Sequence, residues 1–244
     1  MSSTSDTSQT ASVALPGGGT AALRVRRSRR AQRLALRIIP ASGEVELVVP
    51  IRASVKQGIA FAREKAGWLK AHLGNLPAPV PFENGAIIPV FDKPRRIRRT
   101  DDLFGGIWLT EKELQVAAPP ETVPLVVRGW LRKRAKAELT SRAEEKTGLL
   151  NRRFRRLTVR DTASRWGSCS PQGDLSFSWR IVMAPEYALD YLVAHEVAHL
   201  KEMNHSSRFW AIVDDLADQP DRGRVWLRDH GASLHRFGVD VRSL

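Results

Sequence analysis

The sequence has few of the features that would assign a protein to a class at once. Its 244 residues include a single cysteine, Cys169, which excludes an internal disulfide framework and is typical of a reducing compartment. No stretch approaches the roughly 18 consecutive apolar residues that a membrane span requires. The Ser/Thr-rich beginning also lacks the basic and apolar regions of a signal peptide. We therefore expect a soluble, cytoplasmic protein that does not enter a membrane.

Acidic residues are scarce relative to basic ones. The chain has 39 Lys and Arg but 26 Asp and Glu, which gives a formal net charge of +13. Such an excess attracts polyanions, so nonspecific contact with nucleic acid is one interpretation. No helix-turn-helix, zinc-finger or RNA-binding signature accompanies the arginines. The other interpretation is a solvated basic surface without a dedicated ligand, which is the usual one for runs of charge.

Hydrophobic residues make up 42% of the chain, enough to form a buried core. Residues 1–12 almost lack large apolar side chains, and we expect them to be a disordered tail. Alternating segments and glycine turns then predict a small antiparallel sheet and further strands over residues 13–120. This β-rich N-terminal region should contain one helix, which Ser54 caps and which runs to about Leu73.

The pattern changes near Pro119-Pro120, where we place a loose domain boundary. Residues 121–240 begin with a long predicted helix from Val126 to about Thr147. A basic strand and a hairpin that turns at residues 171–174 follow. The remainder of the chain is predicted to be helical.

The segment HEVAHLKEMNHSSRFW, at residues 195–210, holds three of the six histidines. Residues four apart lie on one face of a helix, so His195 and His199 can offer ring nitrogens to a single ion. Glu196 lies about 100° around the helix from His195, which suits a carboxylate that holds a water molecule without binding the metal itself. The spacing therefore predicts a catalytic metal site.

A catalytic zinc site needs a third protein ligand, and His205 is the candidate. An unbroken helix would point His205 away from the other two histidines. We expect the helix to end first, with Asn204 in a left-handed conformation and Ser206 or Ser207 capping a new helix. His205 would then lie at the joint and turn back toward His195 and His199.

Four segments together resemble one known family: RWGSCS at 165–170, a Trp-Arg pair at 179–180, YLVAHEVAHL at 191–200 and NHSSRFW at 204–210. They are similar to the YgjP-like metal-dependent hydrolases, zincin relatives of the SprT-type zinc proteases. The resemblance extends from about residue 25 to 238. Glu202 stands where the metzincin pattern has glycine, which argues against that subgroup.

The resemblance implies an α+β fold in which a zincin-like catalytic domain follows the small antiparallel N-terminal region. The H-E-x-x-H helix would lie beside an antiparallel β-hairpin. The implied cofactor is Zn²⁺, with His195, His199 and His205 as ligands. Glu196 would be the catalytic carboxylate that assists attack of a zinc-bound water on a peptide bond. The substrate would be a peptide or a protein.

Four further residues are candidates for binding substrate: Arg165, Trp166, Arg180 and Tyr191. The two arginines and the tyrosine could stabilise an oxyanion, whereas Trp166 could contact substrate or simply pack in the core. Two other functions stay open at this point. One is hydrolysis of a non-peptide amide, and the other is a basic nucleic-acid-associated module whose zinc is structural.

Overall fold

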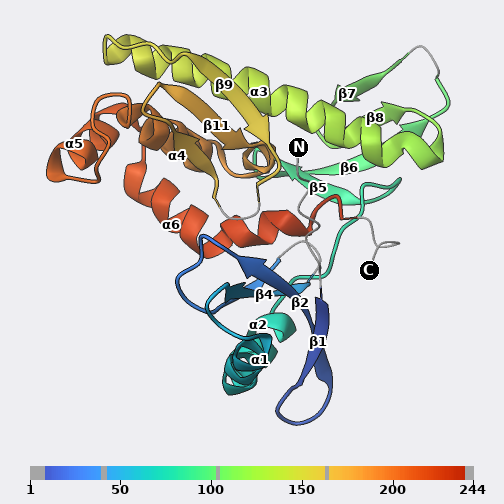
Figure 1. The fold of residues 1–244 in the computed structure, drawn as a ribbon. Coiled ribbons are helices and arrows are strands. Elements are labelled where there is room, and N and C mark those ends of the chain that lie inside the picture. The colour runs from blue at the N-terminus through green and yellow to red at the C-terminus, as the bar shows by residue number, and fades with distance from the viewer. Residues whose placement is uncertain (1–8, 40–42, 103–104, 163–164, 240–244) are drawn as a thin grey trace, which may run out of the picture. The chain divides into compact units, whose positions relative to one another are not determined.

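The computed structural model describes residues 9–39, 43–102, 105–162 and 165–239 (Figure 1). The chain forms two compact units, Met1–Ala78 and Pro79–Leu244. The predicted boundary near residue 120 therefore lies too late, because strands before it contribute Ile88, Ile97 and Leu114 to the core of the second unit. Among the described residues, no helix combines the length and apolar character that crossing a membrane would need.

The first unit is built on a four-stranded sheet of order β1-β2-β4-β3. Its strands are β1 (Gln9–Ala14), β2 (Thr20–Ser28), β3 (Ala35–Ile38) and β4 (Val45–Pro50). The pairs β1/β2 and β3/β4 are antiparallel, but β2 and β4 run parallel, so the sheet is mixed rather than antiparallel. The prediction of a disordered tail is wrong for residues 9–12, because they belong to β1 and pair with β2. Residues 1–8 lie outside the described part of the chain.

Two helices, not one, follow this sheet. Ser54 caps α1 (Val55–Glu64) as predicted, since its hydroxyl accepts a hydrogen bond from a backbone N–H in the first turn. After a break of one residue, α2 (Ala66–Gly74) begins. The break lets Ala62 of α1 and Leu69 of α2 both lie fully buried in the core of the first unit.

The second unit contains a sheet with the same topology. Its strands are β5 (Ile87–Val90), β6 (Lys93–Thr100), β7 (Ile107–Leu109) and β8 (Glu113–Ala117), in the order β5-β6-β8-β7. The outer pairs are again antiparallel and the central pair is parallel. The sequence shows no internal repeat, so this likeness is visible in the structure alone.

A three-stranded sheet of order β10-β11-β9 completes the β structure of the second unit. The predicted hairpin is present as β10 (Gly167–Cys169) and β11 (Asp174–Ser178), which pair antiparallel. The strand β9 (Arg156–Arg160) runs parallel to β11 on its other side. The hairpin strand β10 is therefore at an edge of this sheet.

The helices of the second unit surround a central helix, α4. This helix contacts α3, α5, α6 and the strand β10 (Figure 1). The long helix α3 buries one face, because Val127, Leu131, Ala135 and Leu139 recur every four residues. The chain is thus a mixed α+β protein, as predicted. The helical segments are η1 (Pro120–Thr122), α3 (Val123–Leu149), η2 (Trp179–Met183), α4 (Glu186–Ala198), α5 (Ser207–Leu216), α6 (Pro220–His230) and η3 (Gly231–Arg236).

Candidate metal centre

The helix α4 presents two of the three histidines. His195 lies in its last turn and His199 is its C-cap residue, so the two imidazoles are neighbours with ring centroids 5.2 Å apart. The residues of α4 from 188 to 194 are all buried. Because packing fixes the helix on all sides, it holds both rings at defined positions.

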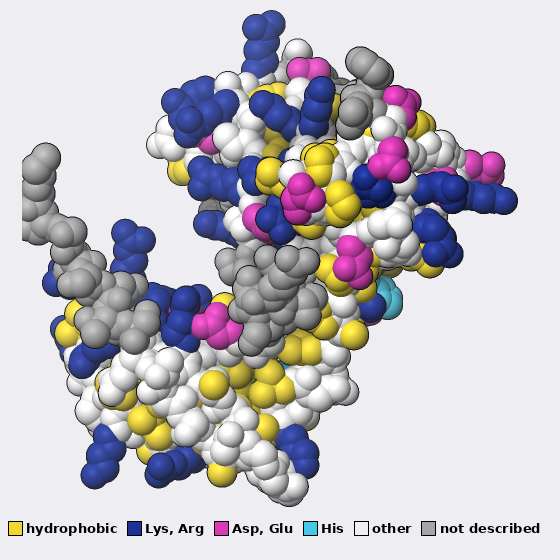
Figure 2. All heavy atoms as spheres, turned by 90° about the vertical axis from the view of Figure 1, so that its right-hand side faces the viewer, with side chains coloured by type: hydrophobic (Ala, Val, Ile, Leu, Met, Phe, Trp, Pro, Cys, Tyr) yellow, Lys and Arg dark blue, Asp and Glu magenta, His cyan; other side chains and the backbone are white. Residues whose placement is uncertain are grey.

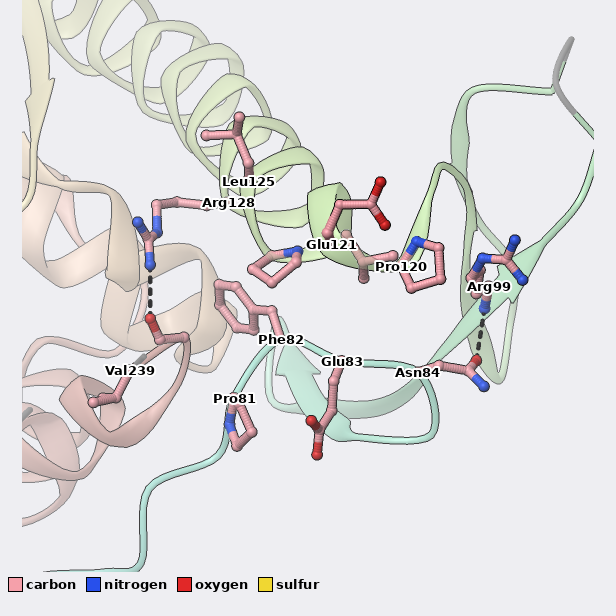
Figure 3. A pocket seen from close by; sticks show the side chains of 13 residues that line it. Pro81, Phe82, Glu83, Asn84, Arg99, Pro120, Glu121, Leu125, Arg128 and Val239 are labelled. Carbon is pink, nitrogen blue, oxygen red and sulfur yellow. Dashed lines mark hydrogen bonds between the residues drawn. The ribbon is translucent and has the colours of Figure 1, made fainter. Parts of the chain in front are cut away.

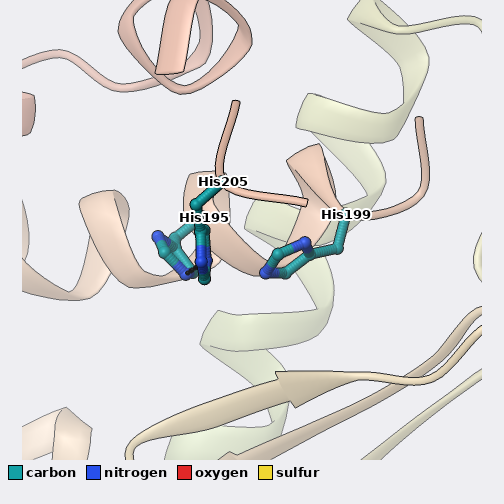
Figure 4. Close-up of side chains that lie close together, drawn as sticks. All are labelled: His195, His199 and His205. Atoms are coloured by element: carbon teal, nitrogen blue, oxygen red, sulfur yellow. Dashed lines mark hydrogen bonds between the residues drawn. The ribbon is translucent and has the colours of Figure 1, made fainter. Parts of the chain in front are cut away.

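A turn after α4 returns His205 to the same place. The Nε2 atom of His205 lies 3.2 Å from Nε2 of His195. One ring nitrogen from each of the three histidines lies within 4.8 Å of the others. Figure 4 shows the rings pointing toward one another. The predicted convergence of His195, His199 and His205 is therefore present.

The route of the chain between the histidines differs from the prediction. The helix already ends at Ala198, and Asn204 does not adopt the left-handed conformation expected of it. A tight turn reverses the chain instead, since the backbone N–H groups of Lys201 and Glu202 both donate to the carbonyl of Ala198. The predicted cap at Ser206 is confirmed, because its hydroxyl accepts a hydrogen bond from the N–H of Phe209.

The ring nitrogens are arranged to bind a cation. His199 Nδ1 lies 3.1 Å from the carbonyl oxygen of Glu202, which leaves its Nε2 free to act as a ligand. His195 Nδ1 is buried and has no hydrogen-bond partner among the described residues. Burial lowers the pKa of His195 to about 4 and also lowers the pKa of His199. Neutral imidazoles with facing lone pairs suit zinc, so the residues present fit that ion.

Two aromatic side chains of α5 border the histidines, and the sequence did not reveal this role. The Phe209 ring centroid lies 4.9, 4.6 and 4.7 Å from those of His195, His199 and His205. Trp210 stacks on His205 with centroids 5.8 Å apart. The only available signal was their place in the segment NHSSRFW. These rings make one side of the histidine cluster apolar.

Glu196 lies next to the histidines and is 5% exposed. Burial raises its pKa to about 7, and the positive charge of Arg165 acts in the opposite direction. The side chain of Cys169, on the neighbouring strand β10, is half-buried, and burial raises its thiol pKa to about 11. Cys169 is therefore a neutral thiol at pH 7, while Glu196 can both accept and release a proton.

The structure separates the four candidate substrate-binding residues. Arg165 is exposed and acts electrostatically on Glu196, and Tyr191 lies with its ring centroid 5.9 Å from that of His195. Trp166 is half-buried and packs against His235, with ring centroids 5.2 Å apart. Tyr191 therefore borders the histidines, whereas Arg165 and Trp166 directly precede the strand β10 of the hairpin.

Arg180 does not fit the role predicted for it. It is 4% exposed and donates hydrogen bonds to Asp161 and to the carbonyls of Leu234 and Phe237. Its guanidinium also lies 4.5 Å from the centroid of the Trp179 ring. Because Arg180 is buried and its N–H groups bond within the fold, it is a structural residue rather than a substrate contact.

One cavity of the second unit lies apart from the histidines. Its volume is about 750 Å³, and Arg128 beside it donates a hydrogen bond to the carbonyl of Gly238 (Figure 3). None of the histidines lines it, so this cavity is separate from the candidate metal centre. The lining residues are Pro81, Phe82, Glu83, Asn84, Arg99, Pro120, Glu121, Val123, Pro124, Leu125, Arg128, Gly238 and Val239.

Basic side chains do not form one stripe on the face that Figure 2 presents. Figure 2 shows Lys and Arg groups dispersed among apolar and acidic side chains on the face it presents. Some arginines are paired, as Arg142 is with Glu138 and Glu186. Contact with nucleic acid stays a prediction.

Comparison with known proteins gives one family match. The sequence model of the family described as "YgjP-like, metallopeptidase domain" matches residues 32–230. No curated protein matches the chain. Among solved structures, the chain is similar to the metallopeptidase zymogen of Pyrococcus abyssi abylysin, with 20% identity and a TM-score of 0.33. That match covers 37% of this chain and 94% of the other.

Proposed function

Because the chain belongs to the YgjP-like metallopeptidase family, we propose that it is a zinc metallopeptidase whose ion is held by His195, His199 and His205. The observation that carries the proposal is the convergence of three ring nitrogens within 4.8 Å beside a buried carboxylate. Three protein ligands leave one coordination position for water or substrate, which is the arrangement of catalytic rather than structural zinc.

The three histidines would bind the ion as neutral ligands. When bound, zinc supplies a Lewis acid that polarises the scissile carbonyl and lowers the pKa of water. The backbone carbonyl of Glu202 orients His199 through its Nδ1, and Phe209 excludes water from one side of the rings. These contacts hold the ligand set in one geometry.

Glu196 would move the proton. Peptide hydrolysis requires a base for the attacking water and an acid for the leaving amine, and one carboxylate can serve both steps in turn. Glu196 comes directly after the ligand His195, and its carboxyl reaches the strand β10. It would therefore accept a proton from water and donate it to the amine nitrogen.

The edge strand β10 would align the substrate. Among the described residues, β10 pairs with β11 alone, so its other edge has no strand partner. An extended peptide can add to such an edge by backbone hydrogen bonds, which needs little side-chain specificity. Arg165 and Trp166 directly precede β10 in the chain, and the ring centroid of Tyr191 lies 5.9 Å from that of His195; these three are the proposed substrate contacts.

The test compares metal content and cleavage of fluorescently labelled, unfolded casein. We expect roughly one zinc per chain in the wild type, kept in Glu196→Gln and lost in His199→Ala. A general base contributes about 10²–10⁴-fold, so Glu196→Gln should cut the cleavage rate by at least about a hundredfold. The matched controls are Glu186→Gln, on the first turn of the same helix, and His230→Ala, an exposed histidine of α6.

The outcomes separate the alternatives. Full activity in Glu196→Gln would contradict the mechanism. Hydrolysis of small amides without any cleavage of casein would point to a non-peptide substrate. Zinc that stabilises the fold while no substrate is cleaved would indicate a structural ion.

A further inference from the structure

The strand β10 approaches the site most closely at Gly167. A Cβ atom built at this position would lie 2.5 Å from Oε1, 2.6 Å from Cγ and 2.8 Å from Cδ of Glu196. Nonbonded contacts of this kind fall well inside the ~3.5–4.0 Å optimum for carbon atoms. Any side chain at position 167 would therefore have to move the carboxylate of Glu196.

The need for glycine here concerns space and not backbone conformation. Gly173, in the turn of the same hairpin, has a φ of +78°, a left-handed conformation that favours glycine. Gly167 has no positive φ, and it lies in regular antiparallel register opposite Phe177. An alanine could adopt this backbone without strain, so the neighbouring glutamate is what opposes it.

The strand cannot retreat to make room. Phe177, its partner on β11, is 1% exposed, and the N–H of Ser178 donates to the carbonyl of Trp166 at 2.8 Å. The indole of Trp166 is held in turn, because a Cβ at Gly231 would lie 2.9 Å from its Nε1. The segment before Gly167 is thus anchored against η3, and β10 against the core.

The helix cannot retreat either. Ala194, Val197 and Ala198 of α4 are completely buried and form part of the hydrophobic core of the second unit. With both backbones fixed, only the side chain of Glu196 can change its position, through rotation about its own bonds.

From this geometry we propose that Gly167 is a positioning residue for Glu196. By leaving the space of a side chain empty, it lets the carboxylate lie against the edge strand on which we place the substrate. The inference rests on the proposed function for its catalytic meaning. The positional part stands on the contacts alone.

The first test is a crystal structure of the metal-free Gly167→Ala protein. We expect the Glu196 oxygens to be displaced by about 1 Å or more, since a new methyl group needs its van der Waals distance. The three imidazoles should keep their places. A carboxylate that stays in its native position would overturn the proposal, and this result does not depend on whether the protein cleaves peptides.

The second test is kinetic and uses the zinc-loaded protein with labelled casein peptides. We expect Gly167→Ala to lower kcat at least tenfold, to change KM less than threefold and to leave the zinc content unchanged. Glu196→Asp, shorter by one methylene, should lower kcat alone but cause no further loss in the Gly167→Ala background. A double variant whose loss of kcat equals the product of the two single losses would contradict a positioning role. A wild-type kcat in Gly167→Ala would contradict it as well. The matched control is Gly129→Ala on α3, where a Cβ would meet nothing within 4 Å.

A third variant covers failure to fold. If Gly167→Ala does not fold, the same change should be tolerated in a Glu196→Ala background, with a Tm equal to that of Glu196→Ala alone. A double variant that also fails to fold would show that the glycine serves the strand itself and would overturn the proposal. A wild-type protein that binds zinc but cleaves nothing would refute the proposed function, and the crystal structure would still decide the positional claim.

Discussion

Two polar clusters of the second unit make opposite use of their hydrogen-bonding atoms. In the histidine cluster, ring nitrogens face one another and His195 Nδ1 is buried without a partner among the described residues. In the cluster around Arg180, the guanidinium bonds to Asp161 and to two backbone carbonyls. The facing ring nitrogens can therefore hold a cation, whereas the guanidinium already has its partners within the fold. Buried polar residues thus indicate a reactive site where their lone pairs converge, and a structural role where their donors bond within the fold.

The largest expected effect concerns the fold and comes from the arginine cluster. Arg180→Met should lower the free energy of unfolding by about 3 kcal/mol, because two carbonyls and one carboxylate lose a charged donor. Urea unfolding of the metal-free protein measures this. A change in the free energy of unfolding of less than about 0.5 kcal/mol would contradict the structural role of Arg180. A folded variant that had lost its affinity for zinc would contradict the separation of the two clusters.

A second prediction uses the pH dependence of the same cluster. Burial, followed by the charge of Arg180, lowers the pKa of His235 to about 4, whereas an unfolded histidine titrates near ~6.5. Between these values the unfolded chain binds a proton that native His235 does not. The free energy of unfolding that neutral His235 contributes is therefore fully present above about pH 6.5. This contribution is lost as the pH falls toward 4. His235→Phe, which keeps a ring against Trp166, should reduce this loss by about 2 kcal/mol.

The measurement is urea unfolding of both metal-free proteins at pH 7 and pH 4.5. His195, whose pKa is also lowered to about 4, titrates in both proteins and cancels from the difference. An equal loss of stability in wild type and variant would show that His235 is not the group that titrates.

The smallest expected effect lies in the histidine cluster. It is the backbone carbonyl of Glu202, and not its carboxylate, that lies beside His199 Nδ1. Glu202→Ala should therefore change zinc affinity less than about twofold, whereas loss of a group that orients a ligand typically costs 10–100-fold. Competition with a zinc chelator measures the affinity. A tenfold loss would assign the orienting role to the side chain.

The sequence predicted the local part of the site and missed the part built from distant segments. The first and last of the three histidines, His195 and His205, are only ten residues apart in the sequence. Helix geometry and a chain reversal therefore sufficed to predict that they meet. That the Glu202 carbonyl orients His199 could not be read from the sequence, because it depends on where the helix ends and how the chain turns after it. Arg180 was misjudged because its partners lie 19 and more than 50 residues away.

The fold shows the same division. The hairpins β1/β2, β3/β4 and β10/β11 follow from alternation and turn residues. The parallel pairs β2/β4 and β6/β8 join strands that are not neighbours in the chain, and no local pattern predicts them. The late domain boundary has the same origin, since the strands before residue 120 share a core with helices that follow it.

Zinc K-edge X-ray absorption on the wild type and His205→Ala tests the central claim most directly. We expect scattering from three imidazoles at ~2.0–2.1 Å in the wild type and from two in the variant. An unchanged count of imidazoles in His205→Ala would contradict it. So would a sulfur ligand at ~2.3 Å, which would place Cys169 on the metal in place of a histidine.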